Sequence, residues 1–378
     1  MAGARSAPEA QQVLAELCDR LCACGVPLWR VEVFVRTLHP DVIGRRFRWQ
    51  ADEGVAISTA QFALPDKVEI RESLIGRVCA DGLPIRRQLF RAECPVDFPL
   101  LHELREEGVT DFWASPVVFT DGDIHAAIWT TREPLGFTDE QLGGIEAIVT
   151  PLARVAEVRA LRRTAGNILD TYVGSRAGER ILAGQIRRGH TEAIQAAIWL
   201  SDMRGFTALS DRVSSKIMID ILNRYFDCQV PCILNRGGEV LKFMGDGLLA
   251  MFPIDNDGET QKVCCDALAA ALEARTRIAE IDSTGVEDLK EIRFGLALHL
   301  GEVLYGNIGG GNRLDFTCIG PAVNLAARLE KIAAQVGRTI VASSAFAAHF
   351  ESQLMPLGEF TVRGFGAQQM VFGLTDEP

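Results

Sequence analysis

The feature that most limits the fold is the order of short apolar runs and helical patterns in residues 192–374. Runs too short for a helix predict strands, and apolar residues at spacings of three and four predict helices. The predicted elements are strands at 193–200, 239–252 (a hairpin), 292–300, 303–308, 315–319, 339–342, 358–362 and 369–374, a turn at 309–313, and helices at 214–235, 260–281 and 321–335. Strand, helix, hairpin, helix, strand is the order of a ferredoxin-like (βαββαβ) α+β core.

Two aspartates stand where strands of this core end. Asp202 follows the apolar run Ile198-Trp-Leu-Ser, and Asp246 lies in the hairpin turn Gly245-Asp-Gly. The first strand and the hairpin are neighbours in such a layout, so the two carboxylates converge. Carboxylates, water and substrate phosphates are the ligands of Mg²⁺, which favours a divalent-metal site. Each aspartate alone fits a helix cap or a turn equally well.

Residues 191–378 resemble the catalytic domain of class III adenylate and guanylate cyclases. The resemblance rests on three motifs in order, Asp202-Met-Arg-Gly-Phe-Thr207, Lys242-Phe-Met-Gly-Asp246-Gly and Val323-Asn-Leu-Ala-Ala-Arg328-Leu-Glu330. It implies that Asp202 and Asp246 bind two Mg²⁺ or Mn²⁺ ions per site. It also implies that the ribose 3′-hydroxyl of the nucleotide attacks the α-phosphate in line, which releases pyrophosphate and forms the 3′,5′-cyclic product.

The resemblance assigns roles to further residues. Asn324 and Arg328, one helical turn apart, would orient the ribose and stabilise the transition state. The expected triphosphate contacts are Met203, Gly205, Phe206, Thr207 and, by a looser alignment, Arg363. In relatives the metal aspartates come from one subunit and the remaining groups from the other, so the resemblance implies a homodimer with shared active sites.

Lys242 and Thr317 are the positions that select the purine base in this family. A threonine hydroxyl can accept a hydrogen bond from the adenine amino group, although it is less exclusive than the aspartate common at this position. The Lys/Thr pair resembles a bacterial subgroup that includes bicarbonate-stimulated cyclases, so we expect ATP as substrate and bicarbonate as an activator. The alternatives are a guanylate cyclase and a catalytically silent nucleotide-binding dimeric scaffold. A diguanylate cyclase is disfavoured, because its acidic pair after a double glycine is absent from Phe243-Met-Gly-Asp-Gly.

Residues 1–140 form a second predicted α+β domain. Its expected elements are helices at 1–25, 73–80 and 100–107 and strands at 29–36, 44–49, 55–58, 111–119 and 124–131, the last two joined by an Asp-Gly turn. This order resembles a GAF-type ligand-sensing domain, which implies a small-molecule ligand that the sequence does not identify.

Residues 141–190 link the two predicted domains. A capping box at Thr138 and Gln141 starts a helix that continues to Tyr172 with apolar residues three and four apart. This length and an Arg-rich exterior favour a parallel two-chain coiled coil that transmits a signal. The alternative is one long helix lying on its own domain. A basic connector with several glycines is expected after Tyr172.

Composition limits the partners and the compartment. The net charge of -11 and dispersed Lys and Arg residues argue against nucleic-acid binding. The 10 cysteines lack a CxxC pair, which favours buried, reduced thiols. No apolar run approaches the roughly 20 residues of a membrane span, and residues 1–9 lack a signal pattern. The sequence therefore predicts a cytoplasmic protein.

Overall fold

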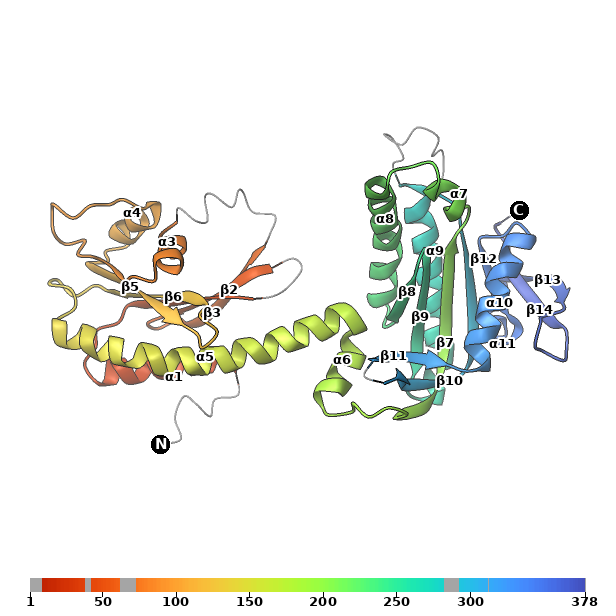
Figure 1. Cartoon of the computed structure of the whole chain (residues 1–378), viewed down its shortest axis with the longest axis horizontal. Coiled ribbons are helices and arrows are strands. Elements are labelled where there is room, and N and C mark those ends of the chain that lie inside the picture. The colour runs from red at the N-terminus through yellow and green to blue at the C-terminus, as the bar shows by residue number, and fades with distance from the viewer. Residues whose placement is uncertain (1–8, 38–41, 62–72, 282–291, 312, 378) are drawn as a thin grey trace. The chain divides into compact units, whose positions relative to one another are not determined.

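The computed structural model describes residues 9–37, 42–61, 73–281, 292–311 and 313–377. Tertiary contacts divide the chain into two compact units, residues 1–168 and residues 169–378. Each unit is built on its own β-sheet with helices against it (Figure 1). We call them unit 1 and unit 2.

Unit 2 contains an eight-stranded sheet with the order β13-β14-β12-β10-β7-β9-β8, and β11 pairs with β10 outside this path. Its strands are β7 (Thr191–Met203), β8 (Glu239–Met244), β9 (Gly247–Ile254), β10 (Phe294–Gly310), β11 (Arg313–Ile319), β12 (Ile340–Ser343), β13 (Leu354–Phe360) and β14 (Gln369–Leu374). The central order β10-β7-β9-β8, with antiparallel neighbours, confirms the predicted ferredoxin-like core.

Helices cover both faces of this sheet (Figure 1). Successive residues of β7 point to opposite faces, so Ala197 and Trp199 pack with α8 and α9 while Ala196 and Ile198 pack with α6 and α10. The helices of unit 2 are α6 (Ser175–Leu182), α7 (Phe206–Ser210), α8 (Ser215–Leu234), α9 (Thr260–Ala279), α10 (Pro321–Gln335) and α11 (Ser344–Ala347), with a 3₁₀ turn at Asp257–Glu259.

Strand β10 corrects one prediction. The sequence predicts two strands, 292–300 and 303–308, whereas the structure has the single strand Phe294–Gly310. A Cβ atom added at Gly301 would lie 2.9 Å from Cβ of Ala322 in α10. This glycine therefore gives the helix room to approach the strand and does not interrupt the strand. The predicted strand 358–362 is also shifted, to Leu354–Phe360. One residue of the predicted turn, 312, lies outside the described residues.

Helix α6 corrects the prediction for the connector after Tyr172. The connector after Tyr172 contains an eight-residue helix, Ser175–Leu182, that follows Gly174 with φ 87°. Gly178 lies inside this helix and is buried. A Cβ atom added at Gly178 would lie only 2.9 Å from Oδ1 of Asp170. The glycine allows α6 to pack closely against the end of the preceding helix.

Unit 1 contains a six-stranded antiparallel sheet with the order β3-β2-β1-β6-β5-β4. Its strands are β1 (Arg30–Arg36), β2 (Val42–Gln50), β3 (Gly54–Gln61), β4 (Ile85–Arg87), β5 (Asp111–Val118) and β6 (Ile124–Thr131). Helices α1 (Ala10–Ala23) and α5 (Asp139–Val173) pack on one face, and α3 (Leu74–Asp81) and α4 (Pro99–Glu106) on the other (Figure 1). The short strand β4 was not predicted, residues 1–8 of the first predicted helix lie outside the described residues, and the GAF type of this unit stays a prediction.

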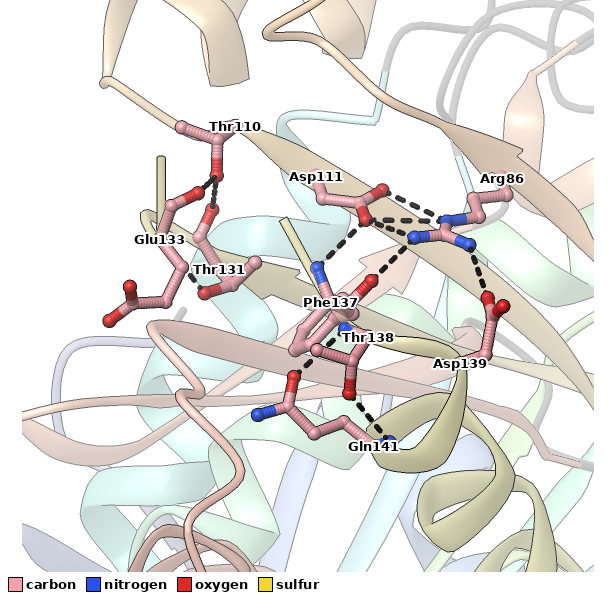
Figure 2. Close-up of polar contacts among 9 residues, drawn as sticks. All are labelled: Arg86, Thr110, Asp111, Thr131, Glu133, Phe137, Thr138, Asp139 and Gln141. Atoms are coloured by element: carbon pink, nitrogen blue, oxygen red, sulfur yellow. Dashed lines mark hydrogen bonds and ion pairs between the residues drawn. The ribbon is translucent and has the colours of Figure 1, made fainter. Parts of the chain in front are cut away.

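The start of α5 is tied to the sheet of unit 1 by polar contacts (Figure 2). Thr138 and Gln141 exchange backbone-to-side-chain hydrogen bonds of 3.0 and 3.2 Å, which confirms the predicted capping box. The buried Asp111 accepts from Arg86 Nη2 at 2.7 Å and from the Phe137 N–H at 3.0 Å. Arg86 also donates to the Phe137 carbonyl at 2.8 Å, so one buried carboxylate joins β4, β5 and the entry to α5.

All 10 cysteine thiols are free. Cys18, Cys232, Cys264 and Cys318 are buried, but three others are exposed, so the predicted burial is correct for only part of the set. In the described part of the chain, no helix is both long and apolar enough to cross a bilayer.

Candidate active site

Asp202 lies one residue before the end of β7. It is opposite Gly295 of β10, and the preceding residue, Ser201, is opposite Leu248 of β9. A Cβ atom added at Gly247 would lie 3.2 Å from Oδ1 of Asp202. The absence of a side chain at Gly247 therefore leaves room for the carboxylate beside the β8–β9 turn.

Asp246 occupies that turn. Met244 and Gly247 are paired, so Gly245 and Asp246 form a two-residue hairpin loop. Gly245 has φ 69° at the first loop position, where a type II′ turn favours glycine. The register and the turn together bring the two predicted metal-binding aspartates to the same end of the sheet.

The two carboxylates interact strongly. Burial raises the pKa of Asp202 to about 7, and the nearby carboxylates of Asp246 and Glu330 act in the same direction. Lys331 acts in the opposite direction. Two carboxylates held this close favour either a shared proton or a bound cation.

Glu330 is a neighbour to which the sequence assigned no role. It is buried in α10, and burial raises the pKa of its carboxyl while the guanidinium of Arg204 lowers it. A Cβ atom added at Gly295 would lie 2.7 Å from Oε1 of Glu330 and 3.6 Å from Nε of Arg204. The signal available in the sequence was an acidic residue at the end of the third motif, on a helix otherwise apolar on that face.

The predicted phosphate-binding turn connects β7 to α7. Gly205 has φ 75°, which allows the chain to turn sharply between Met203 and Phe206. The first backbone N–H groups of a helix have no partner within it, so those of Phe206 and Thr207 are the groups of this turn that could donate to a ligand. The N–H of Arg204 donates to the Arg293 carbonyl at 2.8 Å and is already used.

A β-bulge sets the direction of Lys242. Val240 is opposite Ala250 and Lys242 is opposite Leu249, so Leu241 is the extra residue. Without the bulge, Lys242 would face the same side as Val240. With it, Lys242 lies on the side of Leu249, where its charge lowers the pKa of Cys318 against the larger effect of burial.

Thr317 lies on β11 opposite Gly306, next to Cys318. Its side chain is 3% exposed, and its hydroxyl has no hydrogen-bond partner within the described structure. A buried polar atom without a partner is costly and is often the contact point of a ligand. The structure thus brings the two predicted base-binding residues to neighbouring strands, β8 and β11.

Asn324 and Arg328 are both exposed on α10. They are four residues apart and share one face, whereas Glu330 is displaced from Arg328 by about 200° around the helix. Within the described ranges Arg328 makes no ion pair. One face of α10 therefore adjoins Asp202, and the other presents two polar side chains to the exterior.

Arg363 follows β13 in an exposed turn before β14. The described contacts do not connect it to the aspartate pair, so its predicted phosphate contact stays a prediction. Among the described residues there is also no cluster of three or more His, Cys, Asp and Glu side chains arranged to hold a metal.

Comparison with known proteins identifies the domain. Residues 190–375 match the family of the adenylate and guanylate cyclase catalytic domain. The chain is 32% identical over 161 residues to an adenylate cyclase of Anabaena cylindrica and 28% identical over 169 residues to adenylate cyclase 1 of Rhizobium meliloti. Residues 190–375 are therefore an adenylate and guanylate cyclase catalytic domain.

The similarity is confined to part of each protein. The aligned residues make up 41% and 43% of this chain, and 31% and 25% of those two relatives, so the chain spans less than a third of their length. Among solved structures, the adenylyl cyclase CyaB from P. aeruginosa is similar over 50% of this chain and 97% of that chain, with 25% sequence identity and a TM-score of 0.43.

Proposed function

We propose that this chain is an adenylate cyclase that converts ATP into 3′,5′-cyclic AMP and pyrophosphate. The observation that carries the proposal is the buried Thr317 hydroxyl, which lacks a partner in the described structure, on the strand that adjoins the strand of Lys242. The hydroxyl can accept from the 6-amino group of adenine while the ammonium donates to a ring nitrogen. Guanine presents hydrogen-bond donors at N1 and N2, which a lysine does not accept.

The aspartate pair fits divalent metal. Burial, together with the repulsion between Asp202 and Asp246, raises the pKa of Asp202 to about 7, and a divalent cation would offset that repulsion. Bound Mg²⁺ or Mn²⁺, two ions per site, would supply activation of the ribose 3′-hydroxyl and charge neutralisation at the triphosphate.

The other residues position and stabilise the substrate. Asn324 orients the ribose, and the fixed fork of the Arg328 guanidinium neutralises charge that develops at the α-phosphate. Backbone groups of Met203, Gly205, Phe206 and Thr207, together with the side chain of Arg363, bind the triphosphate.

The active form in this proposal is a homodimer in which Asp202 and Asp246 of one subunit face Asn324 and Arg328 of the other. The exposure of Asn324 and Arg328 supports it. A second support is an apolar stripe on α5, in which Val158, Leu161, Ile168 and Tyr172 are 66%, 59%, 43% and 82% exposed. With Ala165 these residues follow the alternating spacing of three and four that a two-chain coiled coil buries.

The proposal is tested by incubating the full-length chain with ATP or GTP and Mg²⁺ or Mn²⁺ and quantifying both cyclic products. We expect cyclic AMP, with kcat/KM for ATP at least about tenfold above that for GTP, since mispaired polar groups are costly in a buried site. A preference for GTP would identify a guanylate cyclase. Nucleotide binding without either product would identify a silent scaffold.

Active sites that are shared between the two subunits lead to a separate prediction. Asp202→Ala and Arg328→Ala should each abolish turnover, and mixing the two variants should recover up to about a quarter of wild-type activity, because half of the dimers are mixed and each holds one intact site. Mixing Asp202→Ala with Asp246→Ala is the control, since both changes fall in the same half of the site. Equal behaviour of the two mixtures would exclude sharing between subunits.

Regulation is the last part of the proposal. Unit 1 would bind a small molecule and act on the catalytic domain through α5, and bicarbonate would stimulate turnover. The measurement is the rate of cyclic AMP production against bicarbonate concentration at fixed pH and ionic strength. A rate that does not change with bicarbonate would exclude bicarbonate as an activator.

A further inference from the structure

Glu239 is a buried acidic residue to which the proposed chemistry gives no role. It begins β8, three residues before Lys242, which corresponds to about 10 Å along a strand. Its Oε1 accepts a hydrogen bond of 2.7 Å from the hydroxyl of Tyr305, which is itself buried in β10. A buried carboxylate is costly unless its surroundings specify it, so this contact needs a structural reason.

The hydrogen bond joins β8, the strand of Lys242, to β10, which pairs with the strand of Thr317. Tyr305 is directly opposite Cys318 of β11, and Thr317 is the adjacent residue. The ring of Tyr305 also packs edge-on against Phe316, with centroids 4.8 Å apart. The Glu239–Tyr305 bond therefore spans from the strand of Lys242 to the strand pair of Thr317.

The same carboxylate supports helix α6. A Cβ atom added at Gly174 would lie 3.2 Å from Oε1 of Glu239, so the chain enters α6 directly against this group. Burial raises the pKa of Glu239, whereas Tyr305, Arg176 and the backbone N–H of Ala177 in the first turn of α6 lower it. The first turn of a helix favours a negative charge, and α6 has no cap from its own side chains.

We propose that Glu239 and Tyr305 are a positioning pair that sets the distance between Lys242 and Thr317, and that α6 acts on base recognition through this pair. The inference rests on the proposed function, because it assumes that Lys242 and Thr317 bind the base. The aspartates are more remote along the chain, since Asp246 lies seven residues beyond Glu239 at the opposite end of β8. A displacement of α6 should therefore change nucleotide affinity and base preference and leave metal binding unchanged.

The test compares steady-state kinetics of full-length variants with ATP and with GTP at varied Mg²⁺. Tyr305→Phe removes only the hydroxyl. We expect the KM for ATP to rise roughly fivefold, and the kcat/KM for ATP divided by that for GTP to fall roughly fivefold. The Mg²⁺ concentration at half-maximal rate should stay at the wild-type value. Glu239→Ala should reproduce this profile, and Glu239→Gln, whose amide oxygen still accepts from Tyr305, should restore most of the wild-type behaviour.

Two further variants distinguish loss of the Glu239–Tyr305 contact from general destabilisation of the protein. Gly174→Ala disturbs the contact from the side of α6 and should shift base preference in the same direction as Tyr305→Phe. Asp255→Ala removes the Arg176–Asp255 pair of 2.7 Å at the same helix, in which only Asp255 is exposed, and should leave all constants unchanged. If Tyr305→Phe keeps the wild-type KM and base preference, or loses kcat and Mg²⁺ affinity instead, the positioning role is wrong.

Failure of the proposed function would be seen separately. If the wild-type chain forms neither cyclic product, the adenylate cyclase proposal fails. Binding of a fluorescent ATP analogue to wild type and to Tyr305→Phe then decides the positioning role, which requires weaker binding in the variant and is overturned by equal binding.

Discussion

At the scale of single residues, the Thr317 hydroxyl separates a role in binding from a role in folding. Thr317→Val keeps the shape of the side chain and removes a buried hydroxyl that has no partner in the described structure. We expect the nucleotide-free protein to be unchanged or more stable by about 1 kcal/mol, because an unsatisfied group is lost. The KM for ATP should rise, since the base loses an acceptor. Thermal melting and steady-state kinetics measure the two effects.

A loss of stability in Thr317→Val without a change in KM would mean that the hydroxyl has a structural partner and no ligand. Thr361→Val is the matched control, because Thr361 is exposed and lies outside the proposed site. Its stability should stay within about 0.5 kcal/mol of wild type.

His299 gives unit 2 a pH dependence. Burial lowers the pKa of His299 from its usual 6.5 to about 4, and Nδ1 lies 2.8 Å from the Ser343 hydroxyl oxygen. Between pH 6.5 and about 4 the unfolded chain binds a proton that the folded chain does not, so the free energy of unfolding falls by up to about 3 kcal/mol as pH decreases. Above pH 6.5 this contribution is constant.

His299→Gln should remove that part of the pH dependence. The measurement is hydrogen exchange of β7 and β10 peptides against pH in wild type and variant, with the difference between the two curves as the readout. Curves that stay parallel from pH 7 to pH 4.5 would show that protonation of His299 does not contribute to the stability of unit 2.

The site residues differ in how far the sequence could place them. Asp202 and Asp246 were predicted to converge, because strand ends and a Gly-Asp-Gly turn are local signals. The direction of Lys242 depends on the bulge at Leu241, and bulges have no reliable pattern in one sequence. Glu330 and Glu239 were assigned no role, because a lone acidic residue in a helix or strand usually indicates a solvated position.

At the scale of secondary-structure elements, the Arg86–Asp111 contact fixes the start of α5. Asp111→Ala would leave Arg86 and the Phe137 N–H without their shared acceptor (Figure 2). We expect unit 1 to lose about 3 kcal/mol, because one partner of a buried ion pair is removed. Faster hydrogen exchange in β4, β5 and the first turn of α5 would report the loss.

Asp123→Ala is the control for that substitution. It removes the Arg36–Asp123 pair of 3.2 Å, in which both side chains are about half exposed, and should cost less than about 1 kcal/mol. Similar losses in the two variants would contradict the role given to burial.

Glycines account for the largest errors in predicting the elements. Gly301 falls between two predicted strands and Gly178 falls in the predicted connector, and both instead lie inside regular elements where a helix approaches too closely for a side chain. A glycine that ends an element and one that permits close packing look the same in a single sequence. The remaining helices and strands follow apolar periodicity and were predicted to within a few residues, apart from β4 and the short helices α7 and α11.

At the scale of the whole molecule, the α5 stripe predicts the oligomeric state. Leu161→Lys combined with Ile168→Lys places charges at two core positions of the proposed coiled coil and should convert dimer to monomer. Cyclase activity should fall in parallel, because each site needs two subunits. Light scattering at several protein concentrations and turnover on the same samples provide the measurement.

Arg162→Gln, on an exposed face beside the stripe, is the control and should remain dimeric and active. A double variant that stays dimeric and active would mean that the catalytic domains associate without α5.

The two faces of α10 also have a genetic consequence if the sites are shared. A subunit with Arg328→Ala still offers an intact aspartate pair to a normal partner, so a mixed dimer keeps one working site of two. A cell that expresses both alleles equally would therefore make about half of the normal cyclic nucleotide, whichever way the subunits associate. Such an allele would reduce activity in proportion to gene dose and would have no dominant-negative effect on the normal subunit.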